Sequence, residues 1–160
     1  MESESHLDER GQARMVDVGE KSATRREAIA GGRVALSPAA FAALASGSLA
    51  KGDALAVARI AGIQAGKRTS EIVPLCHPVP LDALAVEIEL EEASRTAVVT
   101  ARAVTHAKTG VEMEALTAVS AACLALYDMV KGIDRGCRIV EIALREKSGG
   151  RSGHFVAEPR

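Results

Sequence analysis

Residues 109–131, TGVEMEALTAVSAACLALYDMVK, constrain the fold more than any other stretch of this 160-residue chain. After Gly110 no glycine or proline interrupts the stretch, and Gly132 follows it. Thr109 stands three residues before Glu112, which is the spacing of a capping box: the threonine oxygen accepts from a free backbone N–H and the glutamate reaches back to the cap. The pattern predicts a helix that begins at Thr109 and ends before Gly132.

This predicted helix has two faces when its residues are placed 100° apart. The face expected to lie on the core is formed by Val111, Ala115, Ala118, Val119, Ala122, Leu126, Met129 and Ile133. The opposite face is formed by Met113, Glu114, Ala121, Leu124, Ala125, Asp128 and Lys131. Its middle is small and apolar, so we expect another surface to lie against it. Asp128 and Lys131 can form an ion pair, although an ordinary surface pair of little energetic consequence is the alternative.

The composition excludes several classes of function. Net charge is −1 and the aromatic residues are only Phe41, Tyr127 and Phe155. A chain with so few aromatic side chains is not expected to stack single-stranded bases. Its charge creates no general attraction for nucleic acid or an acidic membrane. We therefore expect neither partner.

The three cysteines, Cys76, Cys123 and Cys137, are odd in number and form no C-x-x-C pair. This pattern argues against a disulfide framework and a structural zinc site, and it suits a reducing cytosol. The chain also shows no signal-type segment and no uncharged apolar run of 18 residues. We expect a cytoplasmic protein.

The length predicts one domain. Residues 1–14 are charged and without period, which indicates a flexible arm before a single domain at 15–160. Alternation predicts strands at 26–36, 81–90, 96–104 and 137–144, and two shorter helices are expected at 38–45 and after Asp53. This order predicts a ferredoxin-like α+β fold, with a four-stranded antiparallel sheet and helices on one face. The open sheet face and the second helix face favour a homo-oligomer.

The helix after Asp53 contains Gly62 and Gly66 four residues apart, together with Ala58 and Ala65. Glycine lowers helix propensity, so packing must stabilise this helix. We expect the small residues to form a ridge where another backbone can approach closely.

The segment Leu75-Cys76-His77-Pro78 contains the first candidate site residue. Pro78 favours an extended conformation at His77, which pre-positions the imidazole to donate to a phosphate or to move protons. A turn histidine with an ordinary hydrogen bond is the alternative. Adjacent residues of an extended chain point in opposite directions, so Cys76 and His77 are not expected to activate each other.

Two further segments carry cations near free backbone N–H groups. Lys51 precedes the start of a helix, where an anion can bind, although most loop lysines are simply solvated. The stretch 147–154, KSGGRSGH, also offers N–H groups to an anion. A flexible surface loop is the alternative there.

Three segments together, KGDALAVARIAGIQAGKRTSEIVPLCHPVPL, KTGVEMEALTAVSAACLALYDMVK and KSGGRSG, resemble the molybdenum-cofactor biosynthesis protein C family, the cyclic pyranopterin monophosphate synthases. The resemblance runs from about Met15 to Phe155, and PLCHP, KTGVEMEALTA and YDMVK are its most specific parts. It implies a ferredoxin-like protomer in a hexamer, built as a trimer of dimers with sites at subunit contacts.

The resemblance also implies an activity. The family converts a 3′,8-cyclised dihydro-GTP into cyclic pyranopterin monophosphate and pyrophosphate, without a redox cofactor; a divalent cation accompanying the triphosphate is left open. A non-catalytic nucleotide-binding oligomer and a Cys76-dependent transferase are the alternatives. Pyrophosphate release from the cyclised substrate and resistance to thiol alkylation distinguish the three.

The resemblance assigns roles to eight residues. They are Asp128 and Lys131 as a catalytic pair with Lys51 beside it, and Leu75, Cys76, His77, Met113 and Glu114 as substrate contacts. If Asp128 is a base and Lys131 an acid, burial and mutual interaction must shift their pKa values toward neutrality. Lys51 and His77 are expected to balance the charge of the triphosphate.

Overall fold

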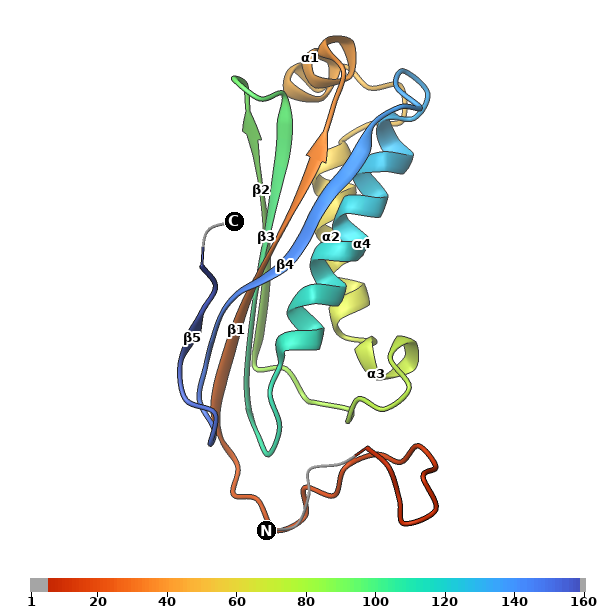
Figure 1. Ribbon diagram of the computed structural model, residues 1–160. Coiled ribbons are helices and arrows are strands. Elements are labelled where there is room, and N and C mark those ends of the chain that lie inside the picture. The colour runs from red at the N-terminus through yellow and green to blue at the C-terminus, as the bar shows by residue number, and fades with distance from the viewer. Residues whose placement is uncertain (1–5, 159–160) are drawn as a thin grey trace.

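Within residues 6–158, which the computed structural model describes, a five-stranded antiparallel sheet carries helices on one face (Figure 1). The strands are β1 (Thr24–Ala35), β2 (Ala83–Glu91), β3 (Thr96–Ala107), β4 (Arg138–Ser148) and β5 (Phe155–Val156). Their order across the sheet is β2-β3-β1-β4-β5, and every neighbouring pair is antiparallel. The helices are α1 (Pro38–Ser46), α2 (Ala54–Gly66), α3 (Thr69–Ile72) and α4 (Glu112–Val130).

The predicted α+β class is confirmed, and so is the placement of the helices on one face. The predicted number of strands is wrong, because β5 adds a fifth strand at the β4 edge. It pairs Phe155 with Lys147 and Val156 with Glu146. A strand of two residues is too short to show an alternating pattern, so no periodicity predicts it.

Both shorter helices begin as predicted, and α1 also ends as predicted. The Ser37 side chain accepts from the Ala40 N–H at the start of α1, and Gly47 ends α1 at φ +67°. Asp53 accepts from the Ala56 N–H at the start of α2. Glycine reaches positive φ without the penalty that a Cβ imposes, so Gly47 terminates α1 cleanly.

The central helix α4 is confirmed, but its predicted capping box is wrong. Val111 is the N-cap residue, and it makes no side-chain cap hydrogen bond. The Glu112 carboxylate instead accepts from the Lys147 Nζ of β4 at 2.8 Å. The Glu112 carboxylate, which the capping box requires, therefore forms an ion pair with Lys147 of β4 instead.

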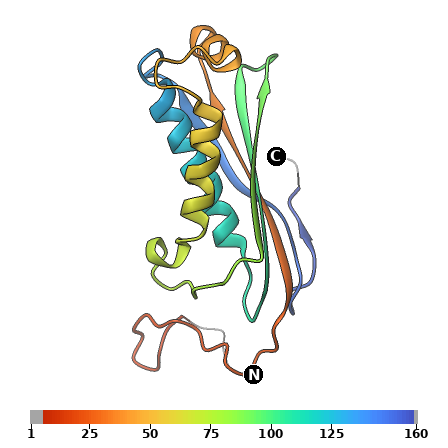
Figure 2. The ribbon, with the colours of Figure 1, turned by 180° about the vertical axis from the view of Figure 1, so that it is seen from behind.

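The inward face of α4 is buried as predicted, except that Ile133 lies beyond the helix end and is 50% exposed. The glycine ridge of α2 is also confirmed, because it packs against α4. A Cβ placed on Gly62 would stand 2.8 Å from the Ala118 carbonyl oxygen. α4 is long and apolar enough to cross a membrane by length and composition, yet here one side of it is buried beneath the sheet and α2 (Figure 2).

The helix-free face of the sheet carries ion pairs. Glu27 accepts from the Arg102 Nε at 2.5 Å, and Glu91 pairs with Arg33 at 2.5 Å. Large exposed apolar side chains lie on the helices and along the β4–β5 edge: Val57, Ile60, Ile72, Leu124, Val140, Ile142, Phe155 and Val156. The helices therefore present exposed apolar side chains as well as the sheet edge.

Part of the predicted arm has local structure. Leu7 pairs with Ala13, and the Asp8 carboxylate accepts from the Arg10 and Gln12 N–H groups at 2.8 Å. This small turn lies beneath α3 and the start of α4 (Figure 1). Residues 1–5 of the arm lie outside the described residues, and the division into an arm and one domain stays a prediction.

Candidate active site

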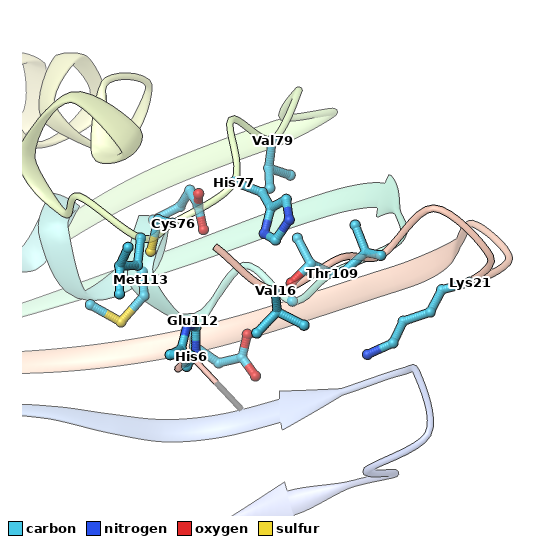
Figure 3. Close-up of a pocket in the computed structure, with 13 residues that line it drawn as sticks. His6, Val16, Lys21, Cys76, His77, Val79, Thr109, Glu112 and Met113 are labelled. Carbon is cyan, nitrogen blue, oxygen red and sulfur yellow. The ribbon is translucent and has the colours of Figure 1, made fainter. Parts of the chain in front are cut away.

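A cavity of about 280 Å³ lies at the N-terminal end of α4. Its walls come from the segment before β1, the proline-containing loop 74–80 and the turn that enters α4. All five predicted substrate contacts line it: Leu75, Cys76, His77, Met113 and Glu114. Figure 3 shows the side chains of Val16, Cys76, His77 and Met113 converging from these segments. The structure therefore brings together residues that the sequence separates by almost forty positions.

Prolines and one buried threonine fix the loop that carries His77. Pro78 and Pro80 supply no backbone N–H, so this segment cannot join a ladder through them. The buried Thr105 hydroxyl of β3 donates to the Pro80 carbonyl and fastens the end of the loop to the sheet. The end of the loop is therefore attached to the sheet, and His77 lines the cavity from this loop.

Lys147 ties the Gly-rich stretch 147–154 to Glu112 in the cavity wall, and Arg26 ties β1 to the chain that leads into α4. Lys147 Nζ lies 2.8 Å from Glu112 Oε1 and 2.7 Å from Ser152 Oγ. Arg26 donates from Nε to the Ala107 carbonyl at 3.0 Å and from Nη2 to the Lys108 carbonyl at 3.2 Å. The stretch is therefore tied to the turn that enters α4, and the choice between an anion site and a mobile loop stays untested.

Sequence patterns did not reveal four residues from the segment before β1 that line the cavity, His6, Val16, Val18 and Lys21. They also did not reveal the hydrogen bonds that Arg26 makes to the chain just before α4. Arg26 contacts residues 81 and 82 positions away. The segment before β1 has no secondary structure that could place it against the loop 74–80. The contacts of Arg26 and of the segment before β1 are both long-range, so no local sequence pattern predicts them.

The predicted catalytic residues form a second cluster. Asp128 Oδ2 lies 2.8 Å from Lys51 Nζ, and Asp128 Oδ1 lies 2.7 Å from Lys131 Nζ. Lys51 also donates to the Asp128 carbonyl at 2.7 Å. The Asp128 side chain is 55% exposed. Sequence spacing predicted the Asp128–Lys131 contact, the resemblance placed Lys51 beside the pair, and the structure shows both contacts.

The cluster and the cavity lie at opposite ends of α4, because Asp128 is near its C-terminal end and Met113 and Glu114 are at its N-terminal end. Figure 1 shows the course of this helix. Met113 and Asp128 are fifteen positions apart, which corresponds to about 22 Å along a helix that rises 1.5 Å per residue. None of the three cluster residues lines the cavity. Within one protomer, the two parts of the predicted site are separate.

The pKa values of the cluster move away from neutrality. Hydrogen bonds from Lys131 and then Lys51 lower the pKa of Asp128 to about 2. The hydrogen bond to Asp128 raises the pKa of Lys131 above its ordinary value. The shift toward neutrality required by the acid–base roles is therefore absent in this protomer, because both side chains are exposed and stabilise each other's charge.

We expect the Asp128 carboxyl to titrate at about pH 2 in side-chain carboxyl NMR. Because its pKa is lowered from 3.8, the folded state favours the carboxylate, and this contribution disappears as the pH falls through about 2. Lys131→Met should raise the pKa of Asp128, since the Lys131 hydrogen bond is the largest cause of the shift. Lys67→Met removes a lysine at the far end of α2 as a control. An unchanged Asp128 titration in Lys131→Met would contradict the ion pair.

Cys76 is poorly suited to nucleophilic chemistry here. Burial, with smaller contributions from Glu114 and Glu112, raises the pKa of the Cys76 thiol. A thiol with a raised pKa carries little reactive thiolate near neutral pH. This environment disfavours the Cys76-dependent transferase.

Within residues 6–158, no group of three or more His, Cys, Asp or Glu side chains is arranged to hold a metal ion.

The model of the MoaC family matches residues 15–150, which is most of the chain. The chain belongs to the MoaC family. Its relatives include proteins named cyclic pyranopterin monophosphate synthase from three bacteria. That of Thermomicrobium roseum is 56% identical over 96% of this chain and 93% of its own length. That of Heliobacterium modesticaldum is 51% identical over 99% of both chains.

The third relative, from Roseiflexus castenholzii, is 55% identical over 96% of this chain and 98% of its own length. Membership of the MoaC family confirms the resemblance predicted from PLCHP, KTGVEMEALTA and YDMVK. Two of these segments supply cavity residues and the third supplies Asp128 and Lys131.

Proposed function

We propose that this chain is a cyclic pyranopterin monophosphate synthase. It converts 3′,8-cyclised dihydro-GTP into cyclic pyranopterin monophosphate and pyrophosphate. The observation that carries the proposal is the convergence of Leu75, Cys76, His77, Met113 and Glu114 on one cavity. This convergence occurs in a chain that is 51–56% identical, along nearly all of its length, to relatives bearing that name.

The size of the cavity supports a division of labour within the site. Its volume of about 280 Å³ lies just below the roughly 300–1,000 Å³ range of ligand pockets. It suits the fused ring system better than a whole nucleoside triphosphate. The triphosphate would extend outward to basic groups, which stabilise the negative charge of departing pyrophosphate.

We propose that the site is completed by a second protomer. About 22 Å of α4 separate the Asp128 cluster from the cavity, too far for one nucleotide-sized ligand to contact both at once. If Asp128, Lys131 and Lys51 of one protomer meet the cavity of a partner, both parts act on one substrate. The exposed apolar side chains of Leu124, Val140 and Ile142 offer a surface for such contact. The assembly proposed is a hexamer, arranged as a trimer of dimers.

The ferredoxin-like description of the protomer is proposed on the arrangement of its first four strands. Their order, β2-β3-β1-β4, and their antiparallel pairing are those of two interleaved β-helix-β units. β5 extends this sheet at one edge. The reaction consists of proton transfers and displacement at phosphate with no net oxidation, so no redox cofactor is proposed, and the proposed compartment is the cytoplasm.

A turnover assay tests the proposed function. The protein is incubated with 3′,8-cyclised dihydro-GTP, with and without Mg²⁺, and pyrophosphate and product mass are measured. We expect one pyrophosphate for each cyclic pyranopterin monophosphate, and none from ordinary GTP used as the control. Binding of the cyclised substrate without pyrophosphate release would instead identify a non-catalytic nucleotide-binding oligomer.

A further inference from the structure

Glu114 stands in the wall between two cavities. The residue is only 4% exposed, and it lines both the cavity of about 280 Å³ and a second one of about 260 Å³. The second cavity lies between the C-terminal end of α2 and the loop 74–80, and Lys67, Thr69 and Ser70 contribute to its lining. In Figure 3 the cavity beside Cys76 and Met113 is the one in which the substrate is proposed to bind. A buried carboxyl group thus borders both the substrate cavity and a second space.

No ion pair holds this carboxyl group among the described residues. Glu112 precedes it on α4, but the Glu112 carboxylate is engaged by Lys147. Cys76 and His77 of the loop 74–80 line the first cavity, the one of about 280 Å³. His6 and Lys21 line the same cavity from the segment before β1. Lys67 lines the second cavity. A buried carboxylate without a paired cation is costly, so the protonated form is favoured.

The electrostatic balance follows from this position. Burial raises the pKa of Glu114 to about 7, Glu112 raises it further, and the residue's own backbone N–H lowers it. The helix N-terminus also favours the carboxylate. The effect of burial is larger than both opposing effects, so Glu114 changes charge near neutral pH.

The Asp128 cluster has the opposite character. A group that gives and takes protons efficiently near neutral pH needs a pKa close to that pH. In the single protomer, Asp128 has its pKa lowered to about 2 and Lys131 has its pKa raised, so both carry their full charge near neutral pH. These residues are better suited to holding fixed charge beside phosphates than to exchanging protons.

We propose that Glu114 is the general acid–base group that exchanges a proton with the substrate in the cavity at the start of α4. The inference rests on the proposed function and deepens it. The Glu114 carboxylate accepts a proton from the substrate and becomes a neutral carboxylic acid. It then returns that proton to another substrate atom, or to water in the second cavity, before the next turnover. The Asp128 cluster supplies fixed charge for the phosphates.

The second cavity makes the return of the proton physically reasonable. Its volume of about 260 Å³ exceeds the ~30 Å³ that one water occupies in the liquid, and hydroxyl and ammonium groups line it. A proton on Glu114 can therefore leave on the side opposite the substrate.

The test is Glu114→Gln in the full-length protein, assayed with 3′,8-cyclised dihydro-GTP. Glutamine keeps the size of the side chain and removes its proton exchange, so we expect kcat to fall about 100- to 10,000-fold with KM changed by less than about threefold. The limb of the kcat/KM pH profile near pH 7 should disappear. Glu114→Asp should restore part of kcat and keep a limb, which a merely structural role does not predict.

Glu27→Gln is the matched control, because it makes the same change in a glutamate that pairs with Arg102 on the helix-free face. Its kcat and pH limb should stay those of the wild type. Carboxyl NMR of the resting protein, with the signal assigned by its loss in Glu114→Gln, should show Glu114 titrating at about pH 7.

Three results separate the possibilities. If the wild type turns over substrate while Glu114→Gln keeps its kcat or its pH limb, the acid–base role of Glu114 is wrong and the proposed function stands. A Glu114 titration below about pH 5 also overturns that role. If the wild type releases no pyrophosphate, the proposed function fails and the acid–base role falls with it, whatever the titration shows.

Discussion

Asp128→Asn is expected to lower pyrophosphate release by about a thousandfold, the size of effect seen when a preorganised charged or hydrogen-bonding group is removed from a catalytic site. Asparagine keeps the shape of the side chain but removes its charge. Lys51 and Lys131, both hydrogen-bonded to Asp128, then lose the carboxylate that orients them. The cluster keeps two cations but no longer holds them in a fixed arrangement toward the phosphates.

The fold should be unaffected, because the cluster is exposed and packs against none of the core. Circular dichroism and size exclusion of Asp128→Asn should match the wild type. Asp134→Asn is the matched control: this carboxylate accepts from the Ser37 N–H at 2.8 Å and has a structural role. Its kcat should stay near that of the wild type. Near-normal turnover by Asp128→Asn would remove Asp128 from the site.

The same variant tests whether two protomers form one site. Asp128→Asn and His77→Ala are each expected to be inactive, since one lacks the cluster and the other lacks a cavity residue. When the two are co-expressed, a dimer containing one of each has one site without either substitution. Random pairing then restores about a quarter of wild-type activity. If each site lies within one protomer, the mixture stays as inactive as its parents.

Local patterns were sufficient for the parts of the fold whose contacts are short in sequence. Periodicity located α4 and the first four strands, and cap residues placed the starts of α1 and α2. The capping box failed because the partner of Glu112 is Lys147, 35 positions away. The spacing of Thr109 and Glu112 does not indicate that Lys147 of β4 will lie close enough to pair with Glu112.

The candidate site shows the same division. LCHP and VEME were recognised as motifs, and the structure brings Leu75, Cys76 and His77 of the first and Glu112, Met113 and Glu114 of the second to one cavity. Their chemistry depends on burial, which a motif does not report. Glu114 and Asp128 both belong to the face opposite the predicted core face, yet one is buried with a pKa of about 7 and the other is exposed with a pKa of about 2. Packing of α2 and the loop 74–80 around one end of α4 creates this difference.

That packing depends on Gly62, and Gly62→Ala is expected to destabilise the protein by about 2 kcal/mol. A Cβ at this position would stand 2.8 Å from the Ala118 carbonyl oxygen and 3.1 Å from Val86 Cγ2. The oxygen belongs to the backbone of α4 and cannot rotate away, so α2 must shift. Overpacking of this kind costs about 1–3 kcal/mol, against a gain in helix propensity of at most about 1 kcal/mol.

Urea unfolding and thermal melting of Gly62→Ala measure this effect, with an expected fall in Tm of roughly 4–8 °C. Gly132→Ala is the matched control, because a Cβ there meets nothing within 4 Å. Without a clash, the same substitution should leave stability unchanged or raise it by up to about 1 kcal/mol. Equal stability of the two variants would mean that α2 and α4 do not approach as closely as the structure shows. The glycine ridge would then not be what sets the position of α2 beside Glu114.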